Sequence, residues 1–152
     1  MSFDAQELYR EVIVDHSRRP RNRRAIESPT GHAVGHNPLC GDRVHVYVKL
    51  DNDGKIEDVS FEGGGCAIST ASASIMTETM VGHTLDEAQK LFESFHERLT
   101  RNGEGPPSDE LDPISAIEGV RRFPARVKCA TLAWHTLKAA IDQRNGDVVK
   151  TE

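Results

Sequence analysis

The sequence lacks a long hydrophobic run. Its longest stretch without a charged residue, residues 63–77, is interrupted by serines and threonines, whereas a membrane-spanning helix needs about 20 predominantly apolar residues. The first ten residues are already charged and amphipathic, and they lack the basic start and the apolar run of a signal peptide. These absences argue against a transmembrane segment and predict a cytoplasmic protein that has no membrane partner.

Cysteine is scarce, and positive charge is not in excess. The three cysteines are an odd number spread over most of the chain, a pattern that argues against a secreted disulfide framework. The net charge of −5 argues against binding of nucleic acid along its phosphates. The exception is a basic run of five arginines within residues 18–24. Such a run can dock nucleic acid or an acidic partner, or it can be a solvated face that follows a helix.

The length of 152 residues predicts one globular domain, residues 1–143, followed by a polar, fraying tail, residues 144–152. Apolar periodicity, capping boxes and turn residues predict the elements of this domain. The predicted helices cover residues 4–16, 66–80, 84–101, 112–120 and 128–142, and the predicted strands cover residues 32–36, 43–50 and 55–61. The last two strands form an antiparallel hairpin around the turn at residues 51–54.

All three cysteines stand at the ends of predicted elements. Cys40 precedes the strand 43–50, Cys66 opens a helix, and Cys129 lies in the first turn of the last helix. Because a helix N-terminus favours thiolate over thiol, we expect Cys66 and Cys129 to be activated. The three glycines before Cys66 do not match a phosphate-binding motif and are interpreted as a flexible turn between strand and helix.

A carboxylate, Asp42, lies two residues after Cys40 and shares its side of the chain if the strand begins at residue 43. Three thiolates and one carboxylate suit tetrahedral zinc. The cysteines are 26 and 63 residues apart, so a zinc finger is excluded, and three unrelated buried cysteines remain an alternative. Among the seven histidines, His32 and His36 share one face of an extended segment but lie too far apart to chelate a metal easily.

Five motifs resemble a known family in their order and sequence. The chain is similar, over roughly residues 7–142, to the SufU branch of the IscU-like iron–sulfur cluster assembly proteins, the family of the NifU N-terminal domain. The motifs are LYREVIVDH at residues 8–16, RPRN at 19–22, NPLCGD at 37–42, FEGGGCAIS with ASAS at 61–74, and FPARVKCATL at 123–132.

This resemblance implies an α+β fold, a small antiparallel sheet packed against several helices, in agreement with the predicted elements. It also implies four metal ligands, Cys40, Asp42, Cys66 and Cys129, with Cys40 as the acceptor of persulfide sulfur. Arg126, three residues before Cys129, could bond to a ligand or to the incoming sulfur, or it could be an ordinary surface cation.

Two features bear on the branch of the family. Lys128 directly precedes Cys129 where IscU scaffolds typically have histidine, and residues 102–117 resemble an insertion of SufU. Both favour a zinc-dependent sulfurtransferase that takes sulfur from a SufS-type cysteine desulfurase, stimulates it, and supplies downstream Suf assembly proteins. The alternatives are an IscU-like scaffold that carries an iron–sulfur cluster transiently and an adaptor with structural zinc. Whether the protein is an enzyme in its own right is left open.

Overall fold

The computed structural model describes residues 5–38, 41–100, 117, 119–120, 123–142 and 148–150. In chain order the elements are α1 (Ala5–Arg18), β1 (Gly31–Asn37), β2 (Asp42–Leu50), β3 (Ile56–Gly64), α2 (Ala67–Met80), α3 (Leu85–Thr100), α5 (Pro124–Asp142) and β4 (Val148–Lys150).

The strands form one sheet in the order β3-β2-β1-β4, and β1, β2 and β3 are antiparallel neighbours. In β2 the side chains alternate, so that Val44, Val46 and Val48 are buried while the residues between them face away from the core. The sheet and its helices confirm the predicted α+β class with a small antiparallel sheet.

Part of the predicted polar tail is paired rather than frayed. Val148–Lys150 forms β4, which runs parallel to Val34–His36 of β1. Without this pairing β1 would be the edge of the sheet, and an edge strand presents unpaired backbone groups that a further segment can bond. The prediction of a frayed tail is therefore corrected for residues 148–150. Their pairing uses backbone groups of β1, which the polar composition of the tail could not indicate.

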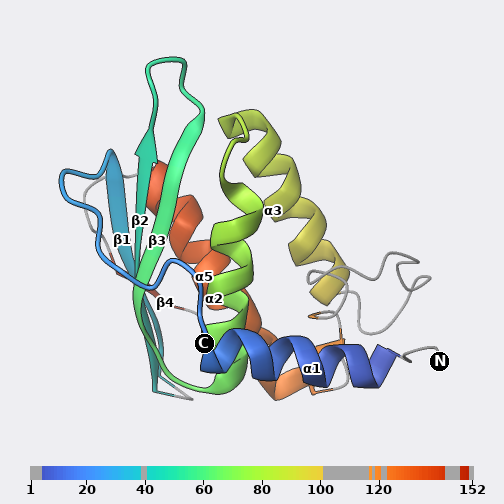
Figure 1. The fold of residues 1–152 in the computed structure, drawn as a ribbon. Coiled ribbons are helices and arrows are strands. Elements are labelled where there is room, and N and C mark those ends of the chain that lie inside the picture. The colour runs from blue at the N-terminus through green and yellow to red at the C-terminus, as the bar shows by residue number, and fades with distance from the viewer. Residues whose placement is uncertain are drawn as a thin grey trace.

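The helices gather on one side of the sheet (Figure 1). Helix α2 packs against β3 and helix α5 against β1 and β2, while α1 packs on α2 and α3 on α5. Large apolar side chains from the sheet, α2, α3 and α5 fill the space between these layers, among them Phe61, Met76, Phe95, Leu132 and Trp134. The indole of Trp134 stacks on Phe95, with 3.9 Å between ring centroids.

One predicted helix start agrees with the structure and another does not. The predicted capping box at Thr84 is confirmed, because the Thr84 amide donates to the Glu87 carboxylate at 2.9 Å and the Glu87 amide donates to the Thr84 hydroxyl at 3.1 Å. The predicted start of the last helix at residue 128 is wrong, since α5 begins at Pro124. Proline fits the first helical position because it needs no amide hydrogen there.

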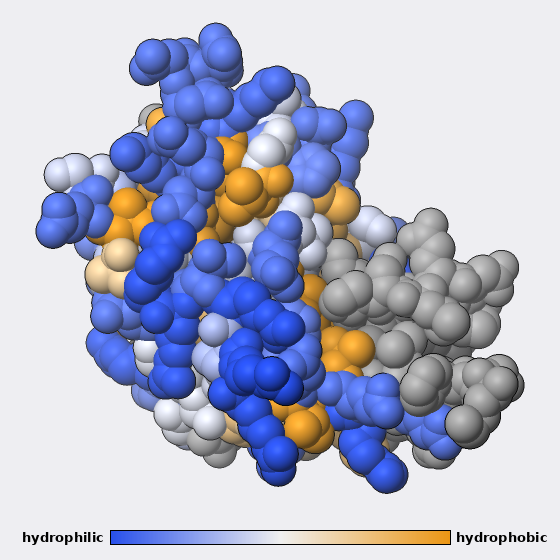
Figure 2. Space-filling view, viewed as in Figure 1, coloured by the Kyte–Doolittle hydropathy of each residue, from blue (hydrophilic) through white to orange (hydrophobic). Residues whose placement is uncertain are grey.

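Two predictions fall mainly outside the described residues. They are the capping residue Asp4 and the short helix predicted over residues 112–120, of which Ile117 and Val120 are described and buried in the core. None of the helices within the described part of the chain is long and apolar enough to cross a membrane. Hydrophilic side chains cover most of the face seen in Figure 2.

The arginine run is only partly a solvated face. Arg21 donates to Asp15 of α1 at 2.8 Å and Arg24 donates to Asp58 of β3 at 2.8 Å. Between them, Asn22 donates to Thr77 of α2 at 3.0 Å, and its carbonyl accepts the Phe61 amide at 3.0 Å. The run therefore fastens the segment after α1 to α2 and to the edge of β3.

Candidate metal centre

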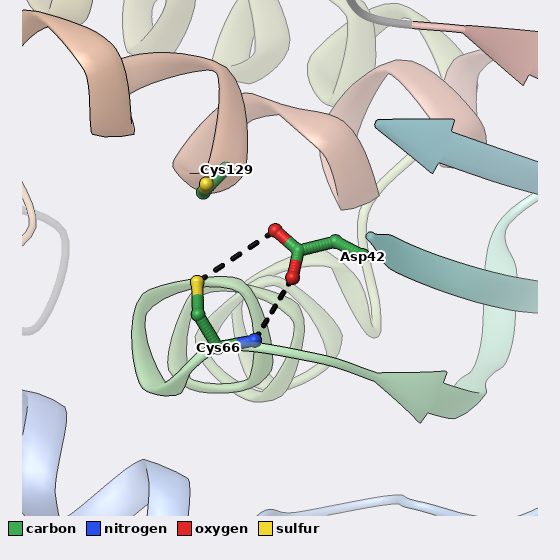
Figure 3. Close-up of side chains that lie close together, drawn as sticks. All are labelled: Asp42, Cys66 and Cys129. Carbon is green, nitrogen blue, oxygen red and sulfur yellow. Dashed lines mark hydrogen bonds between the residues drawn. The ribbon is translucent and has the colours of Figure 1, made fainter. Parts of the chain in front are cut away.

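Three of the four predicted ligands meet at one point. Asp42 stands at the start of β2, Cys66 caps α2, and Cys129 projects from α5 (Figure 3). One donor atom from each residue lies within 4.8 Å of the other two. Asp42 and Cys129 are fully buried, and Cys66 is half-buried. The fourth predicted ligand, Cys40, lies outside the described residues.

Asp42 and Cys66 are joined by two hydrogen bonds, both drawn in Figure 3. The Cys66 amide donates to Oδ1 of Asp42 at 2.9 Å, and the thiol donates to Oδ2 at 3.6 Å. Cys66 is the N-cap of α2, and its sulfur accepts the Ser69 amide at 3.4 Å. The predicted position of Cys66 at a helix N-terminus is confirmed.

The prediction that Cys129 lies in the first turn of the last helix is wrong. Because α5 begins at Pro124, Cys129 lies in the second turn of the helix, away from the unpaired amides of the first turn. Its sulfur instead lies 3.9 Å from Nδ2 of the buried Asn37 at the end of β1. Helix packing, rather than a helix terminus, therefore places this thiol beside the other two groups.

Glycine is required before Cys66 because neighbouring atoms leave no room for a side chain, and not because the segment must be flexible. A Cβ atom on Gly65 would overlap Oδ1 of Asp42, and a Cβ atom on Gly63 would lie 2.5 Å from the carbonyl oxygen of Arg43. Gly63 also has a φ of +85°, which favours glycine. The interpretation of this segment as a flexible turn is thus corrected. The glycines leave room for the carboxylate of Asp42 to lie next to the start of α2.

Sequence reasoning did not single out Asn37 or Gly65. Both lie in motifs that were recognised, NPLCGD and FEGGGCAIS. Their closeness in sequence to Cys40 and Cys66 was therefore the signal that could have found them. What could not be seen was the pairing of Asn37 with Asp42 across β1 and β2. That pairing brings the amide of Asn37 to the same end of the sheet as the carboxylate.

The chemistry of the three groups fits a divalent metal ion. A buried carboxylate needs a compensating positive charge, and in the part of the chain that the structure describes, Asp42 forms no ion pair with a cationic side chain. Zinc accepts both sulfur and carboxylate oxygen, and it has no redox chemistry that would damage thiols. Asp42, Cys66 and Cys129 would supply one oxygen and two sulfur ligands to it.

Two cationic residues precede Cys129 on α5. Arg126 and Lys128 are both exposed, and the Arg126 amide donates to the carbonyl of Phe123 at 2.7 Å in the first turn of the helix. The role suggested for Arg126 beside a ligand or an incoming sulfur stays a prediction.

Comparison with known proteins identifies similar sequences along nearly the whole chain. The profile of the NifU-like N terminal domain matches residues 8–150. The zinc-dependent sulfurtransferase SufU of Bacillus subtilis is 41% identical over 148 residues, covering 96% of this chain and 99% of the relative. The iron–sulfur cluster assembly scaffold protein IscU of Streptococcus pyogenes is 43% identical over 134 residues, covering 88% of this chain and 82% of the relative.

Solved structures share the fold. A protein of Fervidobacterium islandicum AW-1, described as an iron–sulfur cluster assembly scaffold for the SUF system, superposes with a TM-score of 0.78 at 36% identity, covering 91% of this chain and 99% of its own. The N-terminal part of a nitrogen-fixing NifU-like protein from Brucella abortus gives a TM-score of 0.77 at 27% identity, covering 90% of this chain and 93% of its own. The similarity therefore extends to relatives with different names.

Proposed function

This chain belongs to the family of NifU-like N-terminal domains, which includes proteins of iron–sulfur cluster assembly, and on this basis we propose that it is a zinc-dependent sulfurtransferase. The observation that carries the proposal is the convergence of Asp42, Cys66 and Cys129 within 4.8 Å. We assign these three residues, together with Cys40, as the ligands of one zinc ion.

Cys40 is included because of its place in the chain. It lies two positions before Asp42, so covalent geometry limits the distance between their Cα atoms to about 7 Å. When bound, zinc would keep the thiols deprotonated while protecting them from oxidation. The four residues supply three sulfurs and one oxygen, and four donors are the number that a tetrahedral zinc site takes.

We assign Cys40 as the sulfur acceptor. Its thiolate attacks the terminal sulfur of a persulfide on the donor protein, so that a new S–S bond forms on Cys40 and the donor cysteine leaves as a thiolate. Cys66 and Cys129 are less suited to this step, because Cys66 caps α2 and Cys129 is fully buried on α5. Cys40 stands between Pro38 and Gly41 in the segment that links β1 to β2.

The donor in this proposal is a SufS-type cysteine desulfurase, which the protein stimulates by removing its persulfide sulfur, and the recipients are downstream Suf assembly proteins. Two observations support this branch of the family. The similarity to the Bacillus subtilis sulfurtransferase spans nearly the full length of both chains. In addition, Lys128 occupies the position before Cys129, and a lysine ammonium is not expected to serve as a zinc ligand.

A scaffold for iron–sulfur cluster assembly is the second candidate. It is favoured by the relative from Streptococcus pyogenes, which is named a scaffold and is as similar in sequence as the sulfurtransferase. Cysteine sulfurs also hold iron–sulfur clusters, so the same residues could carry a cluster as cargo. The two candidates differ in the metal that the purified protein contains.

The test combines metal analysis of anaerobically purified protein with a desulfurase rate assay. We expect one zinc per chain, stimulation of a SufS-type enzyme, and a persulfide detectable by mass spectrometry on Cys40. Cys40→Ala should abolish sulfur acceptance, whereas Asp42→Ala should weaken zinc binding and retain a sulfur-accepting thiol. Iron and sulfide in place of zinc would favour the scaffold, and full sulfur transfer by Cys40→Ala would refute the assignment of the acceptor.

A further inference from the structure

A pair of neighbouring histidines lies on the sheet face that points away from the helices. His32 of β1 and His45 of β2 are half-buried there, and Nδ1 of His32 lies 3.1 Å from Nε2 of His45. Their ring centroids are 5.2 Å apart. His45 lies three residues from Asp42 along β2, so its side chain points to the face opposite the thiol centre.

The other nitrogen of His45 contacts Tyr47, which is itself bonded to Glu62. Nδ1 of His45 lies 3.2 Å from the hydroxyl of Tyr47, and that hydroxyl donates to the carboxylate of Glu62 on β3. The Tyr47 ring stacks on the imidazole, with 4.2 Å between centroids and 21° between the ring planes, so the hydroxyl lies over the face of the ring rather than along an N–H bond. In the tautomer that carries its proton on Nδ1, Nε2 of His45 has a lone pair that faces His32.

The electrostatics agree with a neutral imidazole at His45. Burial, followed by the neighbouring charge of His32, lowers the pKa of His45, so its ring is uncharged near neutral pH and able to bind a metal. Burial and the bond to Glu62 raise the pKa of Tyr47 to about 12, which keeps the Tyr47 hydroxyl protonated as the donor to the Glu62 carboxylate.

We propose that His32 Nδ1 and His45 Nε2 form a second cation site, which binds one divalent transition-metal ion such as nickel, copper or zinc. Two imidazole nitrogens at about 2.0–2.1 Å from one ion lie roughly 2.8–3.4 Å apart for angles between octahedral and tetrahedral. The observed 3.1 Å falls in this range. The ion takes the position of the single proton that His32 and His45 share.

The surroundings of His45 hold its ring in place, as is usual around a metal-binding histidine. The Tyr47 ring stacks on the imidazole, and Glu62 accepts the hydrogen bond of the Tyr47 hydroxyl. These contacts fix the orientation of the His45 ring. Tyr47 and Glu62 are therefore positioning residues, and water completes the coordination of the ion.

The site differs from the thiol centre in ligand chemistry. It offers two nitrogens and no sulfur, so it suits copper, nickel and zinc and binds less tightly than a complete set of four protein ligands. Zinc-loaded protein should therefore have its thiol centre filled while the histidine pair remains available. Nickel is the probe of choice, because imidazole binds it well and its paramagnetism reports on neighbouring nuclei.

The experiment titrates nickel into the untagged, zinc-loaded full chain and follows binding by calorimetry. We expect one nickel ion per chain beyond the retained zinc, with broadening of the imidazole resonances of His32 and His45. His32→Ala and His45→Ala should each weaken nickel binding at least tenfold. Tyr47→Phe should weaken it by about 10-fold to 100-fold, the range found for residues that orient a metal-bound histidine.

The matched control is His96→Ala/His135→Ala, which removes a second pair of neighbouring histidines with ring centroids 5.2 Å apart, between α3 and α5. This variant should bind nickel as the wild type does. Circular dichroism and zinc content establish that each variant is folded and loaded. Unchanged nickel binding in a folded His32→Ala/His45→Ala variant, or an absence of nickel binding beyond the thiol centre, would overturn the proposal.

Discussion

Gly65 and Asp42 are matched in shape: the carboxylate of Asp42 occupies the volume that a side chain on Gly65 would fill. This relationship lets Asp42 accept the Cys66 amide at 2.9 Å and remain next to both thiols. The position of a proposed metal ligand therefore depends on the absence of a methyl group on the neighbouring strand end.

Gly65→Ala should displace Asp42 and weaken zinc binding by about 10-fold to 100-fold, comparable to the loss of a group that orients a ligand. Zinc per chain and competition with a chromophoric chelator measure the effect. Gly82→Ala is the matched control, because Gly82 has a φ of +90° but a Cβ atom there would meet nothing within 4 Å. That variant should lose some stability through backbone strain and keep its zinc. Equal zinc affinity in the two variants would contradict the steric argument.

Ser72→Ala should lower the free energy of unfolding by about 1–3 kcal/mol, because it leaves buried polar groups without a partner. The Ser72 hydroxyl donates to the carbonyl of Ala130 and accepts the indole N–H of Trp134 at 3.0 Å, so it joins α2 to α5. Urea denaturation measures the change. Thr79→Ala removes only a bond within α2, from Thr79 to the carbonyl of Ile75, and should change stability by less than about 0.5 kcal/mol. A similar loss in both variants would argue against a special role for Ser72.

His16 should make stability fall as the pH falls. It is buried and bonded through Nδ1 to the Ser74 hydroxyl at 2.7 Å. Burial, and then the charge of Arg21, lower the pKa of His16, although Glu78 and Asp15 act in the opposite direction. A lowered folded-state pKa means that the unfolded chain binds the proton more readily. The contribution of His16 is therefore complete above about pH 6.5, the value for an unperturbed histidine, and it is lost as the pH falls toward the folded-state pKa.

The corresponding measurement compares urea midpoints at pH 7.5 and pH 5.5 for the wild type and for His16→Asn. The midpoint of the wild type should fall more than that of the variant between these two values of pH. Other titrating groups, including His45 and His135, whose pKa values are also lowered by burial, are present in both proteins and cancel in the comparison. Parallel changes in the two proteins would assign the pH dependence to those groups instead.

The arginine run offers a test of partner docking that does not disturb the fold. Arg18 and Arg23 are exposed and, among the ion pairs found in the described residues, take part in none. If the desulfurase of the proposed function presents an acidic surface, Arg18→Glu/Arg23→Glu should slow association with it at low salt. The difference from wild type should shrink as salt rises, because charges are screened within about 8–10 Å at physiological ionic strength. Zinc content should not change.

Arg21→Ala is the contrasting variant. Arg21 bonds to Asp15 at 2.8 Å, and its backbone amide bonds to Ser74 at 2.8 Å, so the loss of its side chain should affect stability more than association. If Arg18→Glu/Arg23→Glu activates the desulfurase at the same concentration as wild type at every salt concentration, these two arginines do not contribute to docking.

Local sequence signals predicted the elements that carry the site better than they predicted its interior. The alternation of Val44, Val46 and Val48 indicated β2, and Cys66 was placed correctly at a helix start, because both features depend on neighbours in the chain. The start of α5 was missed although Pro124 suits a first helical position. The apolar pattern used to define that helix begins later than its backbone hydrogen bonds do.

Contacts between segments were beyond the reach of these signals. His32 and His45 are 13 residues apart, and they meet only because β1 and β2 pair with Val34 opposite His45 and His32 opposite Tyr47. A shift of one residue in this register would turn one of the two histidines toward the core. The close fit of Gly65 to Asp42 likewise depends on the exact pairing of Arg43 with Gly64. Periodicity indicates which face a residue occupies, whereas register decides which residues touch.

The spacing of the three site residues along the chain has a consequence for the unfolded protein. Asp42 and Cys66 are 24 positions apart, and Cys66 and Cys129 are 63 positions apart. One ion held by all three residues would close both segments into loops, and by the logarithmic dependence of loop entropy on length, the longer closure costs a flexible chain about 0.9 kcal/mol more than the shorter one. Folding itself removes this chain entropy when it brings β2, α2 and α5 together. An ion therefore meets all three ligands close to one another only after the protein has folded. Metal capture would then select the native topology over any collapsed state in which these three segments are apart.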